Sequence, residues 1–102
     1  MPDFEFQFTT GFTGQGVNVV VDGETRAKFT ARSKFTTGLA HIVPLTLPDR
    51  MTVTLQATTS DMPNMPPLSQ VITVDATTPF VVIAWGSDGF EVSSTSQRPG
   101  YL

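Results

Sequence analysis

Residues 17–23 read Val-Asn-Val-Val-Val-Asp-Gly. Val17, Val19 and Val21 are two residues apart, so a β-strand would place all three on the same face. The Asp22-Gly23 dipeptide that follows favours the tight turn of a β-hairpin. The stretch therefore predicts a strand that ends in a hairpin turn.

The same alternation of apolar and polar residues recurs before and after this hairpin. Near the N-terminus Phe4, Phe6 and Phe8 alternate with Glu5 and Gln7, which is the pattern of a strand with one buried face. Three later segments repeat it, with apolar positions at Ala27, Phe29, Ala31 and Phe35, at Leu39, Val43, Leu45 and Leu47, and at Met51, Val53, Leu55 and Ala57.

Three other features indicate where strands lie within the sheets. Pro44 lacks the N–H that a central strand uses, so an edge strand or a bulge is expected around it. Segments 71–74 and 80–85 are apolar on both faces, which predicts central strands or strands with one face against a partner.

About eight strands result, because Phe90 and Val92 add a short last strand after the turn-forming residues 86–89. The composition agrees, since 16 Thr and 8 Phe against 3 Glu and 2 Lys favour strands over helices. We predict an all-β fold, a two-sheet antiparallel β-sandwich of about seven to eight strands, immunoglobulin-like or prealbumin-like, with a small jelly roll or barrel as the alternative. The 102 residues fit one domain, placed at 1–93 and followed by a C-terminal tail or arm at 94–102.

Three motifs between Val17 and Ala57 resemble those of two prealbumin-like sandwich modules, the carboxypeptidase regulatory-like domain and the PEGA domain. The motifs are VNVVVDG at 17–23, Gly38-Leu39-Ala40, and LTLPDRMTVTLQA at 45–57. Both families place an aspartate-glycine turn after a valine-rich strand and a Leu-Pro turn before a Thr/Val-rich strand. The PEGA tetrad itself is absent from this sequence. The resemblance implies a noncatalytic spacer or binding appendage, and it assigns no functional residue.

Charge and cysteine content exclude several classes of protein. The formal net charge of −3 argues against nucleic-acid binding, which needs a basic surface. The chain has no cysteine, so disulfides, thiolate metal sites and thiol nucleophiles are excluded, and nothing calls for a cofactor. The N-terminal residues lack the pattern of a secretory signal, and no stretch approaches the roughly 20 apolar residues of a membrane helix. We expect a soluble protein, cytoplasmic or within an assembled particle, without membrane insertion.

No catalytic residues can be named, and we expect no enzyme. His41 is the only histidine and no G-x-S-x-G motif marks a nucleophile, which favours a packing or capping role for it. The run Gly11-Phe12-Thr13-Gly14-Gln15-Gly16 lacks a following Gly-Lys-Ser/Thr, so it is interpreted as a flexible turn. If consecutive strands run antiparallel, one end of the sandwich collects four acidic residues, Asp22, Glu24, Asp49 and Asp75. They could form a calcium site. The alternative is that aspartate is simply common in turns.

A basic face is the first candidate site. Arg26, Lys28, Arg32 and Lys34 share one face of the segment 25–35. Such a face could dock an acidic surface or a sulfated or phosphorylated ligand. It could equally protect an exposed sheet edge from aggregation, and the sequence leaves both alternatives open.

The other end of the sandwich is expected to hold the longer loops, which often carry function. Prolines stiffen the loop 58–69 and methionines make it adaptable, so it is a candidate partner contact through Asp61, Met62, Asn64 and Met65. The equal alternative is a polyproline connection that covers the core. Trp85 and Tyr101, the only Trp and Tyr, are candidates for stacking on a sugar. Trp85 ends an apolar strand, however, which favours a role in capping the core.

The expected function is a noncatalytic structural or protein-interaction module that self-associates as an assembly subunit, such as a virion, appendage or adaptor component. Its partner is expected to be another copy of itself or another protein. The alternative is a β-sandwich module that binds carbohydrate or another ligand.

Overall fold

The computed structural model describes residues 2–32, 40–58, 68–86 and 89–97 of the chain. These residues form eight β-strands and no helix. The strands are β1 (Asp3–Phe8), β2 (Thr13–Val21), β3 (Glu24–Arg32), β4 (His41–Thr46), β5 (Arg50–Thr58), β6 (Leu68–Asp75), β7 (Phe80–Gly86) and β8 (Gly89–Thr95).

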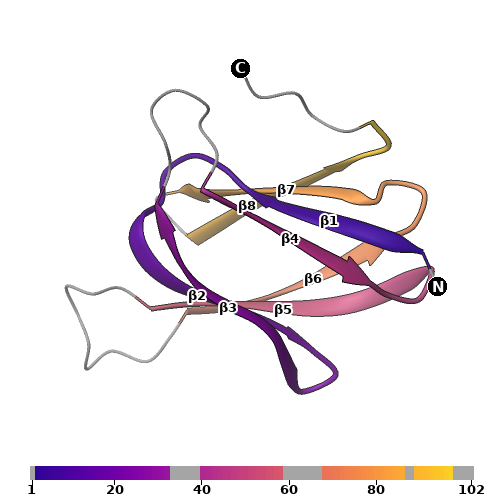
Figure 1. Ribbon diagram of the computed structural model, residues 1–102, viewed down its shortest axis with the longest axis horizontal. Helices are drawn as coiled ribbons and strands as arrows, with labels where there is room; N and C mark the ends of the chain where they lie inside the picture. Colours follow the sequence, from indigo (N-terminus) through magenta and orange to yellow (C-terminus); the bar gives the residue numbers. More distant parts are fainter. Residues whose placement is uncertain (1, 33–39, 59–67, 87–88, 98–102) are drawn as a thin grey trace.

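The strands form two four-stranded sheets, which appear as two layers in Figure 1. Sheet A has the strand order β4-β1-β7-β8, and sheet B has the order β3-β2-β5-β6. Among the described strands the two sheets stay separate and do not close into a barrel. The predicted all-β sandwich is therefore confirmed.

One pair of neighbouring strands departs from the predicted antiparallel arrangement. β1 and β7 are parallel, with Glu5 opposite Phe80 and Phe8 opposite Ile83, whereas the other five strand pairs are antiparallel. All the pairings fit a chain direction that reverses from each strand to the next. Two odd-numbered strands that become neighbours must then be parallel, so the prediction of purely antiparallel sheets is wrong at this pair.

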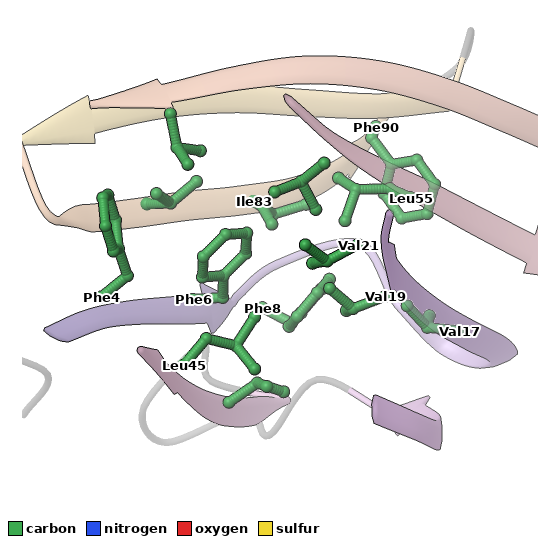
Figure 2. Close-up of a cluster of buried hydrophobic side chains, with 14 of the residues drawn as sticks. Phe4, Phe6, Phe8, Val17, Val19, Val21, Leu45, Leu55, Ile83 and Phe90 are labelled. Carbon is green, nitrogen blue, oxygen red and sulfur yellow. The ribbon is translucent and has the colours of Figure 1, made fainter. Parts of the chain in front are cut away.

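The core lies between the sheets and follows the period of two seen in the sequence. The edge strands β3 and β6 contribute Ala31 and Val74, which are buried. Complete burial of an aliphatic or phenylalanine side chain is worth about 1.5–3 kcal/mol, so this cluster holds the two sheets together. Figure 2 shows its side chains from the other six strands: Phe4, Phe6, Phe8, Val17, Val19, Val21, Leu45, Leu55, Ile83 and Phe90.

The hairpin predicted at Asp22-Gly23 joins β2 to β3. Asp22 has a φ angle of 52° and Gly23 one of 76°, the pair of positive angles typical of a type I′ turn. Val21 pairs with Glu24 across the turn. The dipeptide thus sets the register with which β3 returns along β2.

The glycine-rich run 11–16 does not form the flexible turn expected from the sequence. Phe12 is buried in the core, and β2 already begins at Thr13. The pairing of β2 with β3 shifts between Thr13 and Gln15, as in a β-bulge. The Gln15 side chain braces this bulge, because its Oε1 accepts a 2.7 Å hydrogen bond from the Thr13 N–H.

β8 continues to Thr95, two residues beyond Ser93, where the sequence analysis ended the domain. Thr95 lies opposite Phe80, and Ser94 lies opposite Val81. The first two residues of the expected tail are therefore part of sheet A.

Candidate interaction surfaces

β6 is an edge strand of sheet B, and part of its exposed surface is apolar. Val71 is 65% exposed and Leu68 is 41% exposed, and these are the exposed large hydrophobic side chains of the described residues. The seven residues from Leu68 to Val74 carry no charge. An edge strand presents unpaired N–H and C=O groups, so an uncharged edge can accept another strand.

Residues 71–74 do not form a central strand, which was one of the two alternatives predicted for them. β5 pairs along one side of β6, from Arg50 opposite Asp75 to Ala57 opposite Leu68, and none of the described strands pairs with the other side. A run of β-branched residues looks the same in a central strand and in an uncharged edge strand, so this run cannot separate the two positions. β7, the other segment that is apolar on both faces, does lie between β1 and β8.

Val71 projects from the outer face of sheet B, away from the core. The strand register places it beside Thr54 of β5, which lies opposite Val20 of β2. The neighbouring outward positions of β6 are Ser69 and Thr73, and both are exposed. Val71 is therefore an apolar side chain between two hydroxyl side chains on the edge strand.

The basic face predicted from the sequence lies on β3, the opposite edge strand of sheet B. Arg26, Lys28 and Arg32 are all exposed, and Lys34 lies outside the described residues. The pairing register with β2 skips Arg26, as in a β-bulge. Bulges and charges both oppose the pairing of an edge strand with another chain, so the three cations coincide with a second protective feature.

The two edge strands of sheet A also carry features that oppose pairing. β4 contains Pro44, which is exposed and has no N–H to donate. β4 is an edge strand, which is one of the two alternatives predicted around Pro44. β8 carries the exposed Glu91. The carbonyl oxygen of Phe90 in β8 accepts a 3.2 Å hydrogen bond from Nε2 of Gln70 in β6. β6 is thus the least protected of the four edges.

Trp85 packs against the core, as interpreted from the sequence. Its half-buried ring meets Phe90 edge-on with 5.1 Å between ring centroids, and it lies 6.1 Å from the ring of Phe12. The backbone N–H of Trp85 donates a 2.9 Å hydrogen bond to the carbonyl oxygen of Thr10. The contacts of the Trp85 ring with Phe12 and Phe90 use part of the ring surface on which a sugar would stack.

His41 also has a packing role. Its ring stacks on Phe29 with 4.2 Å between centroids and 22° between ring planes, and Phe29 in turn meets Phe8 edge-on at 4.9 Å. His41 lies on β4 and Phe29 on β3. The stacked pair therefore joins an edge strand of each sheet.

Two of the predicted acidic residues belong to one pair of neighbouring turns. Oδ1 of Asp75 accepts hydrogen bonds from the N–H of Thr77 at 2.9 Å and from its hydroxyl at 2.8 Å. These bonds, and to a smaller extent the charge of Arg50, hold the pKa of Asp75 below its usual value. The N–H of Ala76 donates a 2.7 Å hydrogen bond to the carbonyl oxygen of Asp49.

The other two acidic residues, Asp22 and Glu24, are exposed on the β2–β3 hairpin. Asp22 lines a hollow together with the cationic Arg50 and with Thr52 and Thr73. In the part of the chain that the structure describes, no group of three or more His, Asp or Glu side chains could hold a metal ion.

Gln7 lies on the outer face of sheet A and is nevertheless only 1% exposed. Its Nε2 donates a 2.7 Å hydrogen bond to Oε1 of Glu5, whereas its own Oε1 is buried without a hydrogen-bond partner among the described residues. Its neighbours in the ladder are Ile42 of β4 and Val82 of β7. This oxygen is thus buried and is not open to a ligand.

The remaining predicted site residues, Asp61, Met62, Asn64, Met65 and Tyr101, lie outside the described residues. In the described segments there is no helix of the length and apolar character that a membrane crossing requires.

The resemblance to carboxypeptidase regulatory-like and PEGA domains stays a prediction from the three motifs. Comparison with protein-family models, with curated proteins and with solved structures gave no match.

Proposed function

We propose that this chain is a noncatalytic structural module that self-associates through the β6 edge of sheet B. The observation that carries the proposal is the composition of this edge. It presents seven successive uncharged residues, Leu68 to Val74, with Val71 65% exposed at their centre.

Strand pairing at this edge has two favourable contributions. It satisfies the N–H and C=O groups that point away from β5, and it removes part of the Val71 side chain from water at about 25 cal/mol per Å². Each pair of side chains facing each other across the new ladder adds roughly 0.2–1 kcal/mol. The contributions are individually small, so the association depends on the whole length of β6.

A carbohydrate-binding role has less support from the described contacts. Trp85 is the candidate side chain that the structure describes, and it is half-buried against Phe12 and Phe90. The exposed cations of β3 have two explanations, which are docking of an acidic ligand and protection of the sheet edge.

Light scattering across a concentration series tests the proposal. We expect the mass of the wild-type chain to rise above the 11.0 kDa of one copy, and Val71→Lys to remain at that mass because a charge opposes strand pairing. Thr30→Lys is the matched control, since it adds the same charge at an exposed position of the other edge strand of sheet B.

The wild type and the two variants separate the alternatives. A wild-type mass of one copy at every concentration would contradict self-association. Assembly that survives Val71→Lys would show that another surface carries it and would reject the role of β6.

A further inference from the structure

We infer that the strand pairing with β6 is β6 of a second copy, antiparallel to the first about a two-fold axis through Val71. This inference rests on the proposed function and specifies the partner and the register of the same surface. It makes sheet B one half of a continuous sheet of eight strands, four from each copy.

The uncharged run matches itself about its own midpoint at every pair except one, in which Gln70 lies opposite Ile72. Val71 is the central residue of Leu68–Val74, and a two-fold axis there places it opposite Val71 of the second copy. The next outward positions match a hydroxyl with a hydroxyl, because Ser69 meets Thr73. At the ends of the run an aliphatic side chain meets another, because Leu68 meets Val74. Both kinds of cross-strand pair are favourable.

Other registers lose part of this match. A shift by one residue turns the core-facing side chains of one copy toward the outer face of the other. A shift by two residues places Val71 opposite Ser69 or Thr73 and leaves one end of the run unpaired. With the axis at Val71, Asp75 lies just outside the seven paired positions, so the two copies of this carboxylate stay at opposite ends of the interface.

The opposite edge of sheet B is less suited to self-pairing. Two antiparallel β3 strands would bring together the exposed cations Arg26, Lys28 and Arg32 of both copies, and like charges facing each other are destabilising. With β6 used by both copies and β3 protected, a two-fold interface closes the assembly at two copies.

Cysteine cross-linking tests the register, because the chain has no cysteine of its own. Directly opposite residues of an antiparallel pair have Cα atoms about 4.5–5.5 Å apart, within the range that a disulfide spans. Val71→Cys alone should therefore form a disulfide dimer on mild oxidation. Thr73→Cys alone should not, since its two copies would lie about 14 Å apart along the strands.

A mixture of Ser69→Cys and Thr73→Cys chains provides the sharpest comparison. We expect the mixed dimer, and dimers of Val71→Cys, to form roughly tenfold or more faster than dimers of Thr30→Cys on β3, because pairing holds the thiols at high effective concentration. All of these positions are exposed in the single copy, so the substitutions leave the core intact.

The outcomes distinguish this inference from the proposed function. Rapid dimers of Thr73→Cys alone, or no β6 variant faster than Thr30→Cys, would overturn the two-fold register while light scattering still shows assembly. A wild-type chain that stays at one copy in light scattering would overturn both.

Discussion

At the scale of single residues, Gly11 lies where the chain passes the end of β7 without room for a side chain. Its φ angle is +89°, and a Cβ there would overlap the carbonyl oxygen of Trp85. The carbonyl oxygen of the adjacent Thr10 accepts a 2.9 Å hydrogen bond from the backbone N–H of Trp85. The glycine therefore permits this close approach between the β1–β2 connection and sheet A.

Gly11→Ala should lower the free energy of unfolding by at least about 2 kcal/mol, because the left-handed conformation costs about 1–2 kcal/mol and the backbone must also move. Gly23→Ala is the matched control: its φ is +76°, but a Cβ there has nothing within 4 Å. Urea denaturation of both variants measures the difference. Equal losses of stability would contradict the close approach at Trp85.

Asp75 is the residue whose ionisation should affect stability. Its pKa is lowered in the fold by the hydrogen bonds from Thr77 and by Arg50. A carboxyl with a lowered pKa stabilises the fold above its unfolded pKa, about 3.9 for aspartate, and this contribution is lost as the pH falls through the folded pKa. Asp75→Asn keeps an oxygen that can accept the Thr77 hydrogen bonds but removes the charge.

We therefore expect Asp75→Asn to be less stable than the wild type at neutral pH, and the difference to shrink as the pH is lowered below about 4. Denaturant unfolding at several pH values measures this. A stability difference that does not depend on pH would show that the charge of Asp75 has no such role.

At the scale of strands, the four sheet edges differ in how they are protected. β3 has a bulge and three exposed cations, β4 has Pro44, and β8 has Glu91 together with the hydrogen bond from Gln70. β6 has no charge from Leu68 to Val74. Edge protection by the cations of β3 can be supplied by any charge, whereas docking of an acidic ligand needs positive charge.

Replacing Lys28 and Arg32 by Thr should increase concentration-dependent aggregation, because the β3 edge loses two of its charges. Replacing the same two residues by Glu should leave aggregation at the wild-type level, since charge of either sign opposes pairing. Turbidity and light scattering measure both variants. Aggregation of the Glu variant to the level of the Thr variant would contradict edge protection.

Local patterns predicted most of the strands but only some of their places in the sheets. The alternation of Val17, Val19 and Val21 and the Asp22-Gly23 turn predicted β2 and its hairpin. Pro44 predicted an edge strand or a bulge, and β4 is an edge strand. The edge position of β6 and the parallel β1–β7 pair could not be predicted, because strand order depends on pairings between residues far apart in the sequence. The start of β2 at Thr13 could not be predicted, because glycines and Gln15 occur in a β-bulge as readily as in a loop.

At the scale of the whole molecule, the sheets are held together by one core, and the proposed assembly joins copies through one edge. Two surfaces lie on opposite edges of sheet B. One is the basic face of β3, which was a candidate from the sequence, and the other is the β6 edge, on which the proposed self-association depends. Sequence reasoning found the charged edge because charge is visible in the sequence. It missed Val71 because exposure of an apolar residue depends on strand order.

Amide hydrogen exchange, measured at low and high protein concentration, shows whether copies associate through the β6 edge. In a single copy, none of the described strands pairs with the β6 N–H groups that point away from β5, and these groups should exchange quickly. We predict that raising the concentration slows exchange within residues 68–74 and leaves β3, residues 24–32, unchanged. Slowed exchange in β3, or no change in β6 under conditions where the chain associates, would contradict assembly through the β6 edge.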